Sequence, residues 1–444
     1  MKKVLILGAG LVVRPMVEFL LDNKFSLTIA TTTKEKADRM IKGHPMGSSL
    51  RWSTDETDVL DKLVNEHDIT VSFLPYRYHV LVARTCIKCR KPLVTTSYVQ
   101  PGMQALDEEA RKAGVLLLNE AGLDPGIDHM TAMKVIDFIH GKGGSVDEFY
   151  SLCGALPSPE AADNPLKYKF SWSPKGVVLA SKNSAIYFKK GKKISIEPEN
   201  LFKDRFTYYF PGLGDLEVYP NRDSISYIDI YGIPETRTMY RGTFRYRGWC
   251  EALDAMKSLK MLDETVSDYS NMTYAGFLAE RAGTNTEILK EYITGVMGWD
   301  ESSVPFRSLD YLGFFSDEKL NYKSASPFEI TSDRMISRMT LSTYEQDTVM
   351  MQHIFLASYP DGRKEVIKSS MLDFGSPSEN TAVARTVALP ASIAVKLILD
   401  KTIKLSGVHR PVLPGIYEPV LKELEQLGIE MKEEYGLPVT EIIQ

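Results

Sequence analysis

Residues suited to proton transfer are concentrated in one run, Asn119-Glu120-Ala121-Gly122-Leu123-Asp124-Pro125-Gly126-Ile127-Asp128-His129. Carboxylates and imidazoles are common general acids and bases. Asp124 stands before Pro125 and Gly126, and Asp-Pro-Gly on its own is a turn, because proline presets φ and glycine is permissive. Asp128 has a second interpretation, as the cap of a helix predicted over 130–140. The run is therefore either a reactive turn or a purely structural one.

A second stretch, Gly8-Ala9-Gly10, has the spacing of a phosphate-binding turn. It lies between the apolar run Val4–Leu7 and an apolar helical pattern that starts at Leu11. Gly8 allows a sharp turn, and Gly10 lets the backbone approach a pyrophosphate that sits on the helix N-terminus. Val13 occupies the place of the usual third glycine, so a turn without a ligand is the alternative. The position between strand and helix favours dinucleotide binding.

The elements that must position these residues alternate between strand and helix. Apolar runs predict strands at 4–7, 27–30, 50–53, 69–74, 93–96 and 115–118, and helical patterns fall at 34–41, 57–66, 80–88 and 106–113. This alternation predicts an α/β fold, a Rossmann-type doubly wound parallel sheet. Ligands bind beyond the carboxyl ends of such strands. The predicted rim consists of residues 30–33, 73–76, 96–98 and 119–124.

The end of the second predicted strand bears on the choice of cofactor. NAD enzymes usually carry Asp or Glu there to bind the ribose hydroxyls. This chain has Thr31-Thr32-Thr33, followed by Lys34 and Lys36. The absence of a carboxylate at this point favours NADP over NAD, although no arginine is present in the loop to pair with a 2′-phosphate. The loop also fits a simpler role, with Thr33 as the cap of helix 34–41.

Composition limits the class of protein. The 444 residues are 43% hydrophobic and 25% charged, as in a globular protein with sizeable cores, and the net charge of −5 disfavours nucleic acid as a partner. The apolar stretch 383–399 contains Arg385, Pro390 and Lys396, so we expect a core helix and no membrane partner. Four cysteines do not suggest a disulfide framework, and the first strand is predicted to begin at Val4, which leaves no room for a signal peptide. We therefore expect a cytoplasmic protein. Cys86 and Cys89 fall within a predicted helix, and we expect packing there, not metal or redox chemistry.

Several motifs together resemble saccharopine reductase, the NADP-dependent, glutamate-forming saccharopine dehydrogenase family of lysine metabolism. They extend over nearly the whole chain. They are Gly8–Val12 with Arg14-Pro15, Leu74-Pro75-Tyr76, Thr95–Val99, Asn119-Glu120 with Gly122–His129, Asp163–Leu166, Tyr168–Ser173, Tyr219-Pro220-Asn221-Arg222-Asp223-Ser224, Arg241-Gly242-Thr243, Asp347–His353 and Val395–Asp400. The Asp-Pro-Gly-Ile-Asp-His and Tyr-Pro-Asn-Arg-Asp-Ser runs are long enough to be specific.

The resemblance implies three domains and a homodimer. A nucleotide-binding domain at 1–130 is completed by 386–444, and a mixed α/β substrate-binding and dimerisation domain holds 131–250 and 344–385. A helical insertion occupies 251–343. The residues alone agree, since aromatic, β-rich segments are predicted at 149–153, 185–188, 207–210, 225–231, 239–246, 348–356 and 366–370, and a polar helical pattern separates the last two from the others.

The resemblance also implies the reaction and its residues. Hydride would pass between NADP(H) and the imine or secondary amine that joins glutamate to the semialdehyde of 2-aminoadipate. Asp124 is the first candidate for the proton relay, with Tyr98 and Cys153 as the others. Arginines pair bidentately with carboxylates, of which saccharopine has three. The expected substrate-binding residues are Ser97, Tyr98, Asp124, Arg222, Arg241, Thr243 and Arg245. The expected cofactor-binding residues are Gly8, Gly10, Leu11, Val12, Thr31, Thr32, Thr33, Ser53, Phe73, Leu74, Pro75, Thr96, Gly122, Leu123 and Trp172.

Departures from the family pattern leave alternatives open. Thr31-Thr32-Thr33 replaces Cys-Arg-Thr, and Ser53-Thr54 replaces an Asp-Val pair near the adenine, so NAD remains a possible cofactor. Alternation along Arg241–Arg247 also fits a solvent-exposed basic face. The other functions to weigh are a reductase of another imine-derived amino acid or carboxylated polyamine, and a non-catalytic NADP-binding protein. No metal site is expected.

Overall fold

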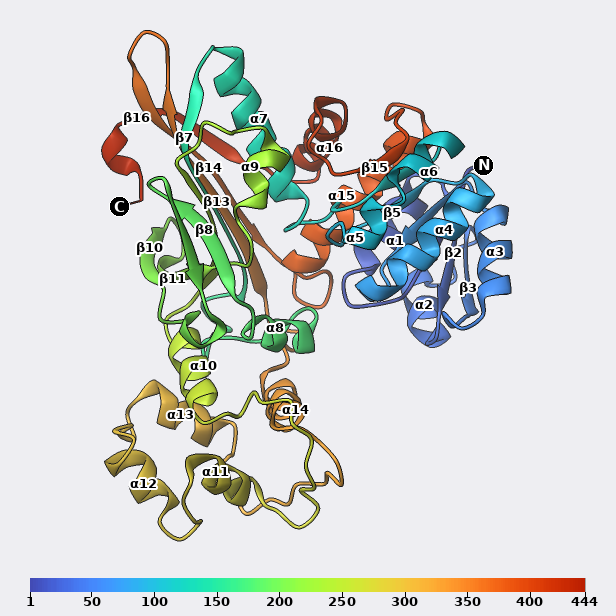
Figure 1. The fold of residues 1–444 in the computed structure, drawn as a ribbon. Coiled ribbons are helices and arrows are strands. Elements are labelled where there is room, and N and C mark those ends of the chain that lie inside the picture. The colour runs from blue at the N-terminus through green and yellow to red at the C-terminus, as the bar shows by residue number, and fades with distance from the viewer. Residues whose placement is uncertain (444) are drawn as a thin grey trace. The chain divides into compact units, whose positions relative to one another are not determined.

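The structure is a computed structural model that describes residues 1–443 (Figure 1). The chain forms two compact units. Unit 1 contains residues 1–151, 228–236 and the chain from 351 onward, and unit 2 contains residues 152–227 and 237–350. The predicted helical segment 251–343 lies within unit 2, whereas residues 131–151 and 351–385 of the predicted second domain belong to unit 1.

Unit 1 is built on a seven-stranded sheet in the order β15-β6-β5-β4-β1-β2-β3, and every neighbouring pair is parallel. The order β3-β2-β1-β4-β5-β6 is that of a dinucleotide-binding fold, with the crossover reversal between β1 and β4. The predicted fold class is confirmed. The strands are β1 Lys3–Leu7, β2 Ser26–Thr31, β3 Gly47–Arg51, β4 Ile69–Ser72, β5 Leu93–Thr95, β6 Leu116–Leu118 and β15 Gly407–His409.

Helices α3, α4 and α6 cover one face of this sheet, where Leu5 and Leu7 of β1 join a buried cluster with Leu60, Ala83 and Ala110. Alternate residues of a strand face opposite sides, so the buried Val4 and Ile6 face the other layer. The helical elements of unit 1 before β7 are α1 Arg14–Asp22, α2 Lys34–Ile41, α3 Thr57–Glu66, η1 Tyr76–Tyr78, α4 His79–Cys89, α5 Pro101–Gln104, α6 Asp107–Ala113 and α7 Ile127–Gly141.

The most apolar helix, α15 (Ala382–Leu399), is long and hydrophobic enough to span a membrane, but 72% of it is buried in the protein. It packs against α1 and against α16 (Pro414–Gln426). Its Thr381 side chain accepts a hydrogen bond from the Ala384 amide and caps the first turn. We conclude that α15 is a core helix of unit 1, as its interrupted apolar pattern predicts.

Unit 2 combines antiparallel strands with a run of helices. β12 (Thr238–Arg245) pairs with β11 (Gly214–Pro220) and with β8 (Ala185–Lys189). Its other elements are α8 Pro174–Ala180, β9 Lys192–Ile196, η2 Pro198–Asn200, β10 Phe206–Phe210, α10 Trp249–Ser258, α11 Tyr274–Ala282, α12 Leu289–Gly295, α13 Val304–Tyr311 and α14 Pro327–Met339. The segment 251–343 is helical, as predicted.

Three elements run through both units: β7 (Ser145–Pro157), α9 (Ser226–Tyr231) and β13 (Asp347–Ser358). In unit 1, β14 (Lys364–Phe374) pairs antiparallel with β16 (Lys432–Leu437), and the short helix η3 covers Val439–Glu441.

Two predicted strands are wrong in type or position. The apolar segment predicted as a strand at 225–231 forms α9, because the Asp223 carboxylate accepts hydrogen bonds from the amides of Ile225 and Ser226 and starts a helix. The strand predicted at 50–53 lies at 47–51, where pairing with β2 sets its register.

Candidate active site

The turn after β1 has the geometry that a dinucleotide requires. Gly8 has φ +102°, its amide donates to the Ala30 carbonyl at 2.8 Å, and a β-carbon there would lie 3.2 Å from the Phe73 carbonyl oxygen. Gly8 is therefore required by the backbone itself. A β-carbon on Gly10, in contrast, would have no protein atom within 4 Å. Gly10 keeps open the space that a pyrophosphate would occupy at the start of α1.

A cleft of about 660 Å³ adjoins this turn. Its volume is in the range of about 300–1,000 Å³ that small-molecule ligands occupy. It is lined by Ala9, Gly10, Leu11, Arg14, Lys36, Arg39, Met40, Lys42 and Ser378. The cleft thus joins the glycine turn to α2, which follows the strand end where the adenosine ribose is expected.

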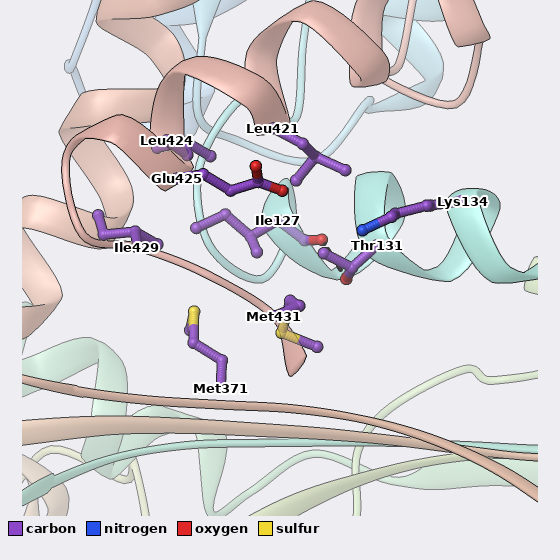
Figure 2. A pocket seen from close by; sticks show the side chains of 9 residues that line it. All are labelled: Ile127, Thr131, Lys134, Met371, Leu421, Leu424, Glu425, Ile429 and Met431. Atoms are coloured by element: carbon purple, nitrogen blue, oxygen red, sulfur yellow. Dashed lines mark hydrogen bonds between the residues drawn. The ribbon is translucent and has the colours of Figure 1, made fainter. Parts of the chain in front are cut away.

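A second cavity, between α7, α16, β14 and the segment 429–431, is too small for a cofactor. Its volume is about 10 Å³, room for about one water molecule. Figure 2 shows the mostly apolar side chains around it, among them Ile127, Met371 and Met431.

The run after β6 folds into a tight loop on the same edge of the sheet as the glycine turn. The Asp124–Pro125 bond is cis, and the Gly122 amide donates to the Pro125 carbonyl at 3.0 Å. Gly126 has φ +150°, and a β-carbon there would lie 1.9 Å from the Gly122 carbonyl oxygen. Only glycine fits this position.

The loop places Asp124 beside Tyr98. The Tyr98 hydroxyl donates a hydrogen bond to the Asp124 carboxylate at 2.8 Å, and both side chains are half-buried. Two of the three predicted proton-relay residues therefore lie together at the carboxyl edge of the unit 1 sheet. The third, Cys153, belongs to β7 in unit 2.

A buried histidine lies beneath these groups. His79, the first residue of α4, is within hydrogen-bond distance of Ser97 Oγ (2.8 Å), Ser72 Oγ (3.0 Å) and Thr95 Oγ1 (3.2 Å). Burial lowers the pKa of His79 to about 4. The ring is therefore neutral at physiological pH, and it orients the Ser97 hydroxyl next to Tyr98.

A buried ionic chain supports the loop from below. Glu120, which has φ +59°, accepts hydrogen bonds from the Val99 amide at 2.7 Å, from Arg410 Nε at 2.9 Å and from His129 Nε2 at 2.5 Å. His129 Nδ1 lies 3.0 Å from the Tyr231 hydroxyl. Burial raises the pKa of Glu120, but the contacts with His129 and Arg410 outweigh it and the pKa falls below its ordinary value. His129 is thus fully buried between Glu120 and Tyr231, and its role here is structural.

Asp128 lies at the start of α7. Its carboxylate accepts hydrogen bonds from the amides of Gly126 at 2.6 Å and His129 at 2.8 Å. The helix begins at Ile127 and not at the predicted residue 130, with Gly126 as its N-cap residue. Asp128 therefore stabilises the N-terminus from inside the first turn, a place where negative charge is favoured.

In unit 2, the segment that carries Arg222 is hydrogen-bonded to the backbone of Arg241. The Asn221 amide donates to the Arg241 carbonyl at 2.8 Å, and the Arg241 amide donates to Ser224 Oγ at 2.9 Å. The Arg241 guanidinium lies 4.2 Å from the centre of the Tyr227 ring and is 2% exposed, whereas Arg222 is exposed. The Tyr-Pro-Asn-Arg-Asp-Ser run is thus directly bonded to the strand that carries Arg241.

Arg245 is buried among aromatic rings. Its guanidinium lies 5.1 Å from the Tyr168 ring, 5.8 Å from Tyr219 and 5.4 Å from Trp249. Its Nη1 donates to the Phe244 carbonyl, and Nε has no hydrogen-bond partner among residues 1–443. Burial raises the pKa of both tyrosines, so these rings stay neutral and do not cancel the charge. The alternative of a solvent-exposed basic face is wrong for Arg241 and Arg245, although Arg247, beyond the end of β12, is exposed.

The sequence matches two families: "Saccharopine dehydrogenase NADP binding domain" over residues 4–118 and "Saccharopine dehydrogenase C-terminal domain" over residues 122–429. The chain belongs to the saccharopine dehydrogenase family. It is 38% identical to the Saccharomyces cerevisiae saccharopine dehydrogenase [NADP(+), L-glutamate-forming] over 97% of this chain and 99% of that protein, and 35% identical to the Schizosaccharomyces pombe protein of the same name over 98% and 99%.

The solved apo structure of histidine-tagged saccharopine dehydrogenase (L-Glu forming) from Saccharomyces cerevisiae matches with a TM-score of 0.91 and 35% identity, over 98% of this chain and all of that one. The bovine mitochondrial alpha-aminoadipic semialdehyde synthase is 34% identical over 92% of this chain, which spans 45% of that longer protein. Both findings support the resemblance that the motifs indicate.

The predicted site residues of this saccharopine dehydrogenase family member divide between the two units. Unit 2 holds Cys153, Trp172, Arg222, Arg241, Thr243 and Arg245, and unit 1 holds the rest. Leu11, Thr32 and Thr33 are exposed next to the glycine turn and α2, and Thr31 is buried. Ser53, Phe73, Leu74, Thr96 and Val12 are half-buried, Pro75 is exposed, and Gly122 and Leu123 are buried within the loop.

The sequence interpretation missed His79, Arg410, Lys36 and Arg39 as members of the site. His79 follows a predicted rim segment, which is a usable signal, and Lys36 was noted only as a nearby charge. Arg410 has no local signal, because it meets Glu120 across 290 residues of chain. The Cys86-x-x-Cys89 pair lies on α4, as expected, and Cys86 is packed in the core, where burial raises its pKa to about 12.

Proposed function

We propose that this protein is an NADP-dependent saccharopine dehydrogenase that forms L-glutamate and 2-aminoadipate 6-semialdehyde from saccharopine and water, reversibly. The observation that carries the proposal is the Tyr98–Asp124 pair, held at the carboxyl edge of a dinucleotide-binding sheet. Close relatives whose names state this activity match the chain from end to end. The function belongs to lysine metabolism.

The chain has room and backbone geometry for the cofactor. Gly10 faces open space where a β-carbon would intrude on the pyrophosphate, and the first turn of α1 presents amides with the positive end of the helix dipole. When bound, the nicotinamide supplies hydride transfer to or from the carbon of the secondary amine. The residues of this chain orient that ring and exclude water from it.

Asp124 and Tyr98 are the proton-transfer groups of the proposal. The Tyr98 phenol donates a hydrogen bond to the Asp124 carboxylate, so a proton donor and a proton acceptor lie one hydrogen bond apart. Such a pair can take a proton from the substrate amine and return it during carbinolamine formation and breakdown. His79 keeps Ser97 oriented beside them, and Cys153 is a further proton-transfer candidate from unit 2.

Arginines of unit 2 bind the substrate carboxylates in this proposal. Arg245 carries a buried charge that no carboxylate of residues 1–443 pairs with. A buried cation is costly unless an anion accompanies it, and a substrate carboxylate would supply one. Arg222 and Arg241, whose segments are joined by the hydrogen bond from the Asn221 amide to the Arg241 carbonyl, supply the other two cations.

A spectrophotometric assay tests the proposal. The purified protein, given saccharopine and NADP, is expected to reduce the cofactor and release glutamate in equal amounts, and the Asp124→Asn variant is expected to lose this activity while it still binds NADP. No absorbance change with saccharopine and either NADP or NAD would overturn the proposal. Equal activity with a carboxylated polyamine would replace saccharopine as the substrate.

Oligomeric state and location belong to the same proposal. A homodimer is supported by the family resemblance, and the cytoplasm by the thiols of Cys86, Cys89 and Cys250, which form no disulfide. Neither nucleic acid nor a membrane is a proposed partner, in line with the net charge of −5 and the burial of α15. Light scattering is expected to give twice the mass of the chain, and a fluorescent fusion is expected to report a diffuse cytoplasmic signal.

A further inference from the structure

The cleft beside Gly10 has a strongly positive wall. Four cationic side chains line it: Arg14 of α1, Lys36 and Arg39 of α2, and Lys42. No carboxylate is among its lining residues. A positively charged cleft attracts anions, and a charge that has no partner within the protein is available to a ligand.

Glu18 neutralises two of them. Its carboxylate lies 2.8 Å from Arg14 Nε and 3.6 Å from Lys42 Nζ, and the pKa of Glu18 is lowered because these contacts and a hydrogen bond from Asn380 outweigh its burial. Arg14 also donates to the Glu379 carbonyl at 2.9 Å. Both cations therefore already have partners within unit 1.

Lys36 and Arg39 are different. Lys34, just before them, pairs with Asp38 at 2.8 Å, and this leaves Asp38 turned away from the cleft wall toward Lys34 and Ser49. Among residues 1–443, no carboxylate forms an ion pair with Lys36 or Arg39. The two residues are three apart on one helix, so they are neighbours on the same face. Both line the same cleft as Gly10.

The position of these charges selects one group of the cofactor. In dinucleotide-binding folds the pyrophosphate binds the amides at the start of the first helix, here α1. The adenosine ribose binds at the end of the second strand, here β2, just before α2. That end is Thr31-Thr32-Thr33, which has neither the carboxylate that binds a free 2′-hydroxyl nor the arginine of the family pattern. The N-terminus of α2, beginning at Lys34, adds a favourable dipole for an anion.

We infer that Lys36 and Arg39 together hold the 2′-phosphate of NADP. They replace the arginine that the family pattern has at position 32, where this chain has threonine. This inference rests on the proposed use of NADP. Lys36 is in the first turn of α2 and acts as a point charge, and Arg39, one turn further, presents the planar guanidinium that pairs with two phosphate oxygens. The specificity for NADP over NAD therefore comes from the α2 face and not from the β2–α2 loop.

Calorimetry with fragments that carry no nicotinamide tests this directly. The full-length protein is titrated with adenosine 2′,5′-bisphosphate and with adenosine 5′-monophosphate. Lys36→Ala and Arg39→Ala are each expected to weaken the bisphosphate by roughly 10- to 100-fold, as for one lost charge-assisted bond, and to change the monophosphate less than about twofold. Binding of the bisphosphate is expected to weaken as salt rises.

Lys34→Ala is the matched control, because Lys34 stands on the same helix but is paired with Asp38 and does not line the cleft. It is expected to leave both affinities unchanged. If Lys36→Ala and Arg39→Ala weaken both fragments equally, or neither, the inference is wrong. Thermal melting of each variant separates these outcomes from misfolding. Because no saccharopine is present, the result is independent of whether the enzyme oxidises that substrate.

Discussion

The Tyr98 hydroxyl lies 2.8 Å from the Asp124 carboxylate, with Tyr98 following β5 and Asp124 following β6. Neighbouring parallel strands end at the same edge of the sheet, which is why two residues 26 apart in sequence share a hydrogen bond. Asp124 is held by a loop that requires glycine at 126 and leaves little room for a side chain at 122. The pair is therefore preorganised before substrate arrives.

The first prediction concerns this pair. Asp124→Asn is expected to lower kcat by roughly 100- to 10,000-fold, the usual contribution of a general acid–base group. Tyr98→Phe should lower kcat less, because Asp124 keeps its carboxylate. Steady-state kinetics with saccharopine, together with the NADP dissociation constant from fluorescence, provide the measurement. If either variant mainly weakened NADP binding, the assignment to proton transfer would fail.

The second prediction separates the arginines of unit 2. Arg241→Ala is expected to lower kcat/KM for saccharopine by at least roughly tenfold, through loss of a charged hydrogen bond to a carboxylate, with the KM for NADP unchanged. Arg241→Lys should recover part of the loss, since lysine keeps the charge but not the planar fork. Arg247→Ala is the control, because Arg247 is exposed beyond the end of β12. Equal losses for saccharopine and NADP would indicate misfolding.

The third prediction is a pH dependence of stability. The pKa of His79 is about 4 in the folded protein and near 6.5 when unfolded, so between these values the unfolded chain binds a proton that the folded chain does not. The stabilisation is complete above pH 6.5 and is lost as pH falls toward 4, by about 3 kcal/mol in total. The free energy of unfolding, measured by urea denaturation at several pH values in this range, is expected to change less with pH for His79→Gln than for the natural protein. If the free energy of unfolding of both proteins changes equally with pH, His79 is not the responsible group.

The fourth prediction compares two glycines. Gly126→Ala is expected to destabilise unit 1 by more than about 4 kcal/mol, because the new methyl group would overlap the Gly122 carbonyl. Gly10→Ala meets no protein atom within 4 Å and is expected to melt like the natural protein, yet to bind NADP at least roughly tenfold more weakly. Thermal melting and a dinucleotide titration check both halves. Normal NADP binding by Gly10→Ala would argue against a cofactor at this turn.

Much of unit 1 follows from local pattern. The helices at 34–41 and 57–66 have the predicted bounds, and the helix predicted at 383–399 begins one residue earlier, because apolar periodicity reports the face that each helix buries. The strand order and the shared rim also follow, since parallel strands alternating with helices leave few topologies. Where the pattern was misleading, as at 225–231, a single capping carboxylate outweighed the apolar alternation.

The sequence by itself determined the family, the parallel sheet and the rim that carries Asp124 and Tyr98, because glycine turns and apolar periods are local properties of the backbone. Only the tertiary structure decided which charges are neutralised. Glu120 meets Arg410 from the far end of the chain, Glu18 pairs with Arg14 and Lys42, and Lys36 and Arg39 are left facing the cleft. Ion pairing and burial depend on distances between residues remote in sequence, which no local pattern records.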